Sequence, residues 1–122
     1  MTAGLQLWSD VEECMAIATL EDYLRAMQAV FVPERARGKR AVLQYVFSGS
    51  ISGACYAVIE DGALQVAEGT HPSPTATVET DFALWLEVVD YRIDGLMAYQ
   101  EGRFRVIGDI ETLMEADTWF VR

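Results

Sequence analysis

The chain has 122 residues and a formal net charge of −10, with hydrophobic residues at 52% and charged residues at 23%. This length predicts a single domain, 1–122, that folds without a disulfide or metal staple, and the apolar content excludes a disordered chain. The excess of 19 acidic over 9 basic residues repels phosphate backbones, which excludes a general nucleic-acid binder. No apolar run approaches the roughly 18 residues of a membrane-spanning helix, so stable membrane insertion is not expected.

The start of the chain and its cysteines bear on the cellular compartment. Residues 1–5 lack the basic stretch that opens a secretory signal. Cys14 and Cys55 are too few for a disulfide framework or a four-cysteine zinc site, and His71 is the only histidine. We therefore expect a cytoplasmic protein with two reduced, buried thiols, no metal and no cofactor.

The N-terminal quarter of the chain is predicted to be helical. A capping box predicts a short helix from Ser9 to Ala16, within an N-terminal extension that covers residues 1–19. A second capping box at Thr19 opens a longer helix, in which apolar residues recur at steps of three and four. Pro33 ends that helix one or two residues earlier.

The middle of the chain changes to the composition of strands separated by turns. Four segments are predicted as strands: residues 42–47, 54–60, 63–68 and 75–80. Asp61-Gly62 between the second and third segments is a strong hairpin signal, so these two strands are predicted to pair antiparallel.

From Asp81 onward the apolar period returns to that of a helix. Asp81 caps a helix that is apolar on two faces, as expected of a helix that is buried on both sides or borders a cavity. Asp94 caps a shorter helix that ends at Gly102, and residues 103–107 alternate as a fifth strand. Asp109 then begins a last helix. One face of this helix is predicted to consist of Ile110, Leu113, Met114, Asp117, Phe120 and Val121.

The order of these elements predicts an α+β fold, because strands that run together and are then followed by helices do not form a doubly wound parallel sheet. The helices carry more apolar side chains than one sheet face needs. An apolar cavity between sheet and helices would absorb that excess.

Three further features leave alternatives open. Asp117 lies on the apolar face of the last helix, either wet at a frayed end or partly buried with a raised pKa. Trp119 and Phe120 either close the core or form an exposed anchor for a protein partner or a second copy of the chain. The basic residues between 35 and 40 belong to a solvated loop or contact an anionic lipid surface or phosphate.

Several segments between residues 31 and 120 carry the pattern of a known family. Residues 94–109 hold a short helix, Gly with Arg, an alternating strand, and Gly-Asp before a final helix. Residues 77–82 form a strand-to-helix junction, and residues 31–38 lead into the sheet. In this order and spacing the sequence resembles the sterol carrier protein-2 (SCP-2) sterol-transfer domain family, in its bacterial single-domain form. The resemblance implies a five-stranded, mostly antiparallel mixed sheet covered by helices, with an apolar tunnel between them.

The resemblance also implies a role, namely non-enzymatic binding or carriage of a fatty acid, sterol or similar lipid. We expect the ligand to contact Trp85, Val89, Met97, Phe104, Val106, Leu113, Met114 and Phe120. One alternative is an accessory module, such as a homodimer, that uses the apolar groove for a protein partner. The other is a small enzyme acting on a lipid-like substrate, with Asp117 or Asp94 as base and Tyr99 as proton donor.

Overall fold

The computed structural model describes residues 19–89 and 92–120, and it confirms an α+β fold with five strands. The predicted short helix from Ser9 to Ala16 lies outside the described residues. In chain order the elements are α2 (Leu20–Val30), the 3₁₀ helix η1 (Pro33–Ala36), β1 (Arg40–Ser48), β2 (Gly53–Glu60), β3 (Ala63–Glu68), β4 (Ala76–Asp81), α3 (Phe82–Val89), α4 (Gly95–Gln100), β5 (Arg105–Gly108) and α5 (Ile110–Asp117).

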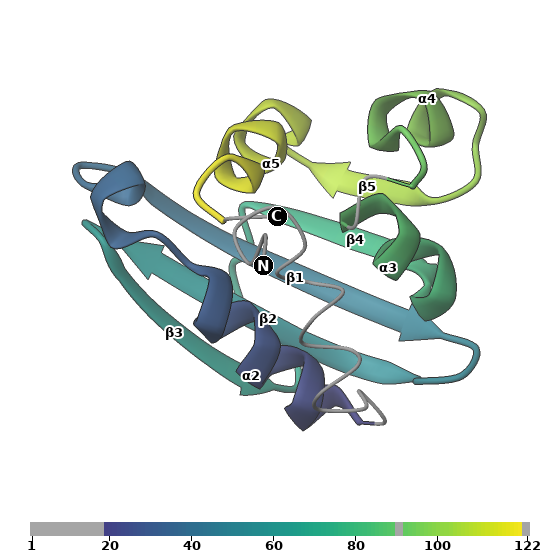
Figure 1. Ribbon diagram of the computed structural model, residues 1–122, viewed down its shortest axis with the longest axis horizontal. Helices are drawn as coiled ribbons and strands as arrows, with labels where there is room; N and C mark the ends of the chain where they lie inside the picture. The colour runs from purple at the N-terminus through teal and green to yellow at the C-terminus, as the bar shows by residue number, and fades with distance from the viewer. Residues whose placement is uncertain (1–18, 90–91, 121–122) are drawn as a thin grey trace, which may run out of the picture.

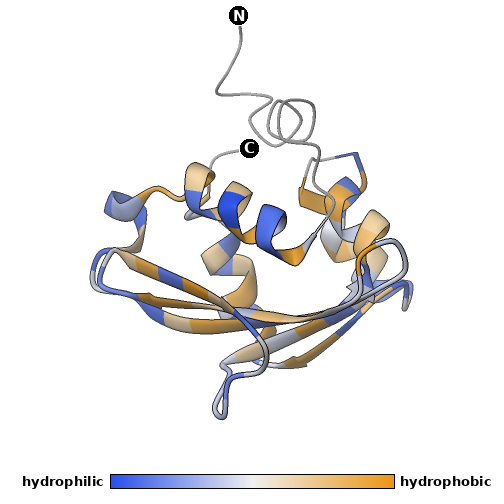
Figure 2. Ribbon diagram, turned by 90° about the horizontal axis from the view of Figure 1, so that it is seen from below, coloured by the Kyte–Doolittle hydropathy of each residue, from blue (hydrophilic) through white to orange (hydrophobic). Residues whose placement is uncertain are grey.

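The five strands form one mixed sheet in the order β3-β2-β1-β4-β5 (Figure 1). Neighbouring strands are antiparallel except for β1 and β4, which run parallel in the centre. Tyr45 of β1 lies between Cys55 of β2 and Val78 of β4, so these side chains share one face. Helices α2, α3, α4 and α5 all lie on that face of the sheet (Figure 2). The expected mixed, mostly antiparallel sheet covered by helices is thus confirmed.

The hairpin between β2 and β3 forms as the sequence predicts. Asp61 and Gly62 both adopt positive φ angles, 48° and 82°, as a tight two-residue turn between right-twisted strands requires. Asp61 also accepts a hydrogen bond from Gly38 N at 2.8 Å and donates its own N–H to the Lys39 carbonyl at 2.8 Å. The turn is therefore tied to the start of β1.

The loop from β3 to β4 crosses the sheet on the face opposite to the helices. His71 N donates to Gln44 Oε1 at 2.7 Å, and the His71 ring packs edge-on against Tyr56. Thr75 Oγ1 accepts a hydrogen bond from Val42 N at 3.0 Å. The only histidine of the chain thus holds a crossover loop in place.

All four predicted helix caps in the described part of the chain are present. Thr19 Oγ1 accepts from the N–H of residue 22, and a carboxylate oxygen accepts at the start of α3, α4 and α5 from Asp81, Asp94 and Asp109 respectively. Each of these bonds satisfies a backbone N–H that the helix itself leaves unpaired.

The last helix is shorter than predicted. It ends at Asp117, where a turn closed by Thr118 follows, so Phe120 is not on a helix face; Val121 lies outside the described residues. Phe120 instead forms an antiparallel bridge with Phe31, and Trp119 O accepts a hydrogen bond from Val32 N at 2.8 Å. We call this contact between residues 31–32 and 119–120 the C-terminal clasp.

The clasp buries two large aromatic rings. The free energy gained by this burial favours the clasp over a continuation of the helix. In the structure Trp119 is 3% exposed and Phe120 is 9% exposed. Both therefore close the core, and the alternative in which they form an exposed anchor is wrong.

Candidate functional site

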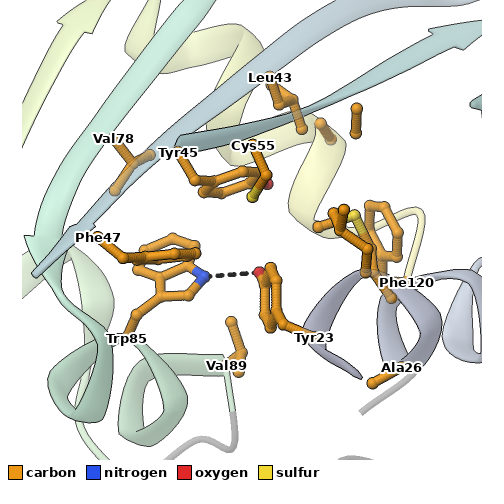
Figure 3. Packing of buried hydrophobic residues seen from close by; sticks show 14 of the residues in the cluster. Tyr23, Ala26, Leu43, Tyr45, Phe47, Cys55, Val78, Trp85, Val89 and Phe120 are labelled. Carbon is orange, nitrogen blue, oxygen red and sulfur yellow. Dashed lines mark hydrogen bonds between the residues drawn. The ribbon is translucent and has the colours of Figure 1, made fainter. Parts of the chain in front are cut away.

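An aromatic cluster lies where α2 and α3 meet the sheet. The ring of Tyr23 packs edge-on against Phe47 and Phe82, and the ring of Tyr45 packs against Trp85. Trp85 Nε1 donates a hydrogen bond to Tyr23 Oη at 2.9 Å (Figure 3). Because both atoms are buried, this bond removes the desolvation cost of leaving them unpaired. It also fixes α3 against α2.

Beside this cluster lies a cavity with a volume of about 480 Å³. This volume falls in the range of small-molecule sites in proteins. The described residues around it come from the helices, the sheet and the segments that connect them. They are Tyr23, Met27, Leu43, Tyr45, Trp85, Val88, Val89, Ile93, Asp94, Gly95, Leu96, Tyr99, Phe104, Val106, Ile110, Leu113, Met114, Asp117 and Phe120. Most of these side chains are apolar, so the cavity is suited to an apolar molecule.

The cavity opens to solvent beside α4 and α5. Leu96 of α4 and Met114 of α5 line the cavity and are still 46% and 48% exposed. Within α4 and α5, only Ala98 and Ala116 are buried. These two helices therefore pack against the core through small residues, and their larger apolar side chains lie at the mouth of the cavity.

Seven of the eight side chains predicted to contact the ligand line this cavity. They are Trp85, Val89, Phe104, Val106, Leu113, Met114 and Phe120. Met97 is 57% exposed and lies outside the lining, whereas its neighbour Leu96 lies within it. Met97 N donates a hydrogen bond to the capping Asp94 Oδ1, which fixes where this six-residue helix begins and thus which side chains face the cavity. So short an apolar pattern does not predict that orientation.

Four lining residues from the N-terminal half were not in the predicted set. Tyr23 and Met27 lie one helical turn apart on α2, and Leu43 and Tyr45 alternate along β1. These spacings do place each pair on one face. Nothing in the sequence indicates which part of the sheet the cavity overlies, so the spacings alone could not assign these residues to a site.

The three polar residues proposed for an enzymatic alternative all line the cavity. Asp94 is exposed and uses Oδ1 to cap α4, Asp117 is half-buried at the end of α5, and Tyr99 is half-buried on α4. Asp117 is thus a polar group at the edge of an apolar pocket. In the described part of the chain, no three His, Cys, Asp or Glu side chains come together as a metal site would require.

The basic segment before β1 is bound to the end of α5. Lys39 Nζ lies 2.7 Å from Glu115 Oε2, and Arg35 Nη1 donates to the Thr118 carbonyl at 3.2 Å. Cations at the carboxyl end of a helix also interact favourably with its dipole. These contacts give the cluster a structural role next to the C-terminal clasp.

Cys55 of β2 is fully buried in the core. Burial and, to a smaller extent, the nearby Glu68 carboxylate together raise the pKa of its thiol from 9.0 to about 12. A thiol with this pKa stays protonated at neutral pH and is a poor nucleophile. Cys14 lies outside the described residues.

Comparison with known proteins identifies the family. From residue 24 to residue 120 the sequence matches the SCP-2 sterol transfer family. The chain belongs to this family. Membership supports lipid or sterol binding or transfer in general, and a domain of this family is typically a non-catalytic carrier. No curated protein matches the chain significantly by sequence.

Solved structures share the fold at low sequence identity. The inverting sec-alkylsulfatase Pisa1 from Pseudomonas sp. aligns with a TM-score of 0.76 and 18% identity over 83% of this chain, but this covers only 16% of the sulfatase. Sterol carrier protein 2-like 2 from Aedes aegypti aligns with a TM-score of 0.59 and 18% identity, over 81% of this chain and 94% of that one. A palmitated form of that Aedes aegypti protein gives a TM-score of 0.52 and 20% identity, over 70% of this chain and 77% of that one.

None of the helices in residues 19–89 and 92–120 has the length and apolar character needed to cross a lipid bilayer.

Proposed function

We propose that this protein binds and carries an apolar small molecule in the cavity between its sheet and helices, without chemical conversion. The observation that supports this most directly is a 480 Å³ cavity with an apolar wall and exposed apolar side chains at its mouth. The related protein from Aedes aegypti has been solved in a palmitated form, which supports a long apolar chain as the type of ligand.

The size of the cavity is consistent with useful affinity. Enclosing roughly 400 Å² of apolar ligand surface yields about 10 kcal/mol at about 25 cal/mol per Å². Subtracting about 4 kcal/mol for lost translation and rotation leaves roughly 6 kcal/mol, or a Kd on the order of 10⁻⁵ to 10⁻⁴ M. Buried aromatic walls such as those of Trp85 and Phe104 add to this.

The first experiment is native mass spectrometry of the freshly purified protein, followed by lipid extraction under denaturing conditions. A co-purified adduct of lipid size supports the proposal and begins to name the ligand. A ligand-free mass that also stays unchanged after incubation with Nile red, an uncharged apolar dye, overturns it.

A pair of variants tests whether the ligand occupies this particular cavity. Met114→Trp places a larger ring in the mouth and should weaken Nile red binding at least tenfold, because the ring fills space that the dye would occupy. Met97→Trp adds the same side chain on the neighbouring exposed surface, outside the lining, and should leave binding within twofold. Equal effects from the two variants would place the dye elsewhere. Circular dichroism should show the same fold in both.

The cytoplasmic location, the bacterial origin and the homodimer stay predictions. Sedimentation at two protein concentrations tests the homodimer, since self-association raises the measured mass at the higher concentration.

A further inference from the structure

The three methionines in the described part of the chain differ in their exposure and in their position relative to the cavity. Met27 of α2 lines the cavity but is only 2% exposed. Met97 of α4 is 57% exposed but lies outside the lining. Met114 of α5 is 48% exposed and also lines the cavity. Of these three side chains, Met114 alone borders both the solvent and the cavity.

Exposure makes the side chains of Met97 and Met114 accessible to an oxidant such as hydrogen peroxide. The thioether lone pair attacks one peroxide oxygen, and the S–O bond forms as the O–O bond breaks. The sulfur is oxidised by two electrons to the sulfoxide, the peroxide is reduced, and the second oxygen leaves with both protons as water. Cys55 does not compete for the oxidant, because its side chain is fully buried.

Oxidation of Met114 changes the chemistry of the cavity mouth. A sulfoxide is polar, and its oxygen accepts hydrogen bonds from water. Ile110 and Leu113 line the cavity beside Met114 on the same helix, and their side chains carry no hydrogen-bond donor. An apolar ligand that covers the sulfoxide therefore removes its water without replacing the hydrogen bonds, which has a free-energy cost.

We propose that Met114 is an oxidation site that controls ligand binding, because conversion of its thioether to the sulfoxide lowers the affinity of the cavity for apolar molecules. An oxidant of the peroxide class thus releases the ligand. This inference rests on the proposed function, since it assigns a regulation of the same cavity. Met97 is oxidised without consequence for binding, and Met27 is protected by its burial.

The experiment treats the full chain with hydrogen peroxide, removes the peroxide, and compares peptide masses and Nile red affinity before and after. Peptide mapping should find one added oxygen on Met97 and on Met114, with Met27 still reduced, and Nile red should bind at least about fivefold more weakly. A Met114 that stays reduced while Met97 is oxidised overturns the proposal, as does unchanged affinity once Met114 is oxidised. If the untreated protein does not bind Nile red, the proposed function falls as well.

Two variants assign the loss of affinity to one sulfur. Met114→Leu keeps an apolar side chain of similar size at the mouth but cannot form a sulfoxide, so its affinity for Nile red should stay within twofold after treatment. Met97→Leu removes the exposed sulfur outside the lining and should lose affinity as the unsubstituted protein does. Equal losses in the two variants would place the damage elsewhere and overturn the proposal.

Reduction of the sulfoxide provides the last check. Methionine sulfoxide reductases, one for each sulfoxide epimer, return the sulfoxide to the thioether. Once peptide mapping shows that Met114 is reduced again, the Nile red affinity should return to within twofold of the untreated value. An affinity that stays low at that point overturns the proposal, because an irreversible change elsewhere would be the cause.

Discussion

Helices α2 and α5 lie on the same face of one sheet and differ in how they use it. Six of the eleven residues of α2 are buried, whereas α5 buries one of eight. The strand beneath α2 carries small residues such as Gly53 and Cys55, and the Leu20 side chain approaches Gly53 so closely that a Cβ there would lie 2.9 Å from it. The α2 half of the molecule is therefore the more closely packed of the two.

In the half formed by α3, α4 and α5, most of the large apolar side chains of α4 and α5 are not buried, and a cavity lies between these helices and the sheet. Trp85 and Phe104 contact each other edge-on at 5.8 Å and form part of the wall of the cavity. The difference teaches that one half of this small domain supplies the stability and the other half can stay hollow for a ligand.

The largest expected effect separates the two halves directly. Ile59→Ala removes a fully buried side chain from the packed half and should lower the free energy of unfolding by about 2 to 5 kcal/mol, because it leaves a void. Leu113→Ala removes a half-buried side chain from the cavity wall and should cost below about 1 kcal/mol, because space is already present there. Urea unfolding measures both. Equal costs would mean that the α5 half is packed as solidly as the other.

The second prediction concerns the boundary between the halves. Tyr23→Phe deletes the acceptor of the Trp85 Nε1 hydrogen bond and should cost about 1 to 3 kcal/mol, because a buried N–H is left unpaired. A double-mutant cycle with Trp85→Phe isolates the pairwise energy. A coupling energy near zero would show that water from the cavity reaches this bond. The contact between α2 and α3 would then not be part of the closely packed half.

The third prediction tests how dry the packed half is. The Cys55 thiol has a pKa of about 12 in the folded protein, whereas its ordinary value is 9.0. Between these values the folded state holds the extra proton, so the free energy of unfolding should fall as pH rises, by about 1.4 kcal/mol per unit above about pH 9. Subtracting the same curve for Cys55→Ala removes the contribution of other groups. A difference curve that stays flat would mean that the thiol is hydrated.

Much of the fold follows from local signals in the sequence. The Asp61-Gly62 turn and the caps at Thr19, Asp81, Asp94 and Asp109 each act over a few residues, so their positions could be predicted directly. The parallel pairing of β1 with β4 depends on a crossover held by His71 and Thr75, which contact residues about thirty positions away. The family resemblance implied a mixed sheet, but this particular pairing was not predicted.

The sequence predicted that the cavity would be lined by apolar side chains of the C-terminal third, but it did not predict all of the lining residues. The surplus of apolar side chains on α3 indicated a cavity, and most of the side chains chosen from the C-terminal third do line it. Met97 lies outside the cavity lining, and so short a helix does not define its phase in the sequence. Phe120 reaches the cavity from the C-terminal clasp rather than from a helix. The contribution of Tyr23 depends on how α2 meets α3, which is a tertiary property.

The C-terminal clasp has a consequence for the order in which the molecule forms. It joins residues 31 and 120, and closing a loop of about ninety residues has an entropic cost that the contacts of a short bridge do not offset alone. The sheet must therefore assemble first, and α5 docks last. We predict that the amide proton of Val32, bonded to Trp119 O, exchanges with solvent sooner than those of β1 and β2, because this bridge can open without breaking the sheet. We therefore expect the contact that forms last in folding to be the first that opens in the native protein.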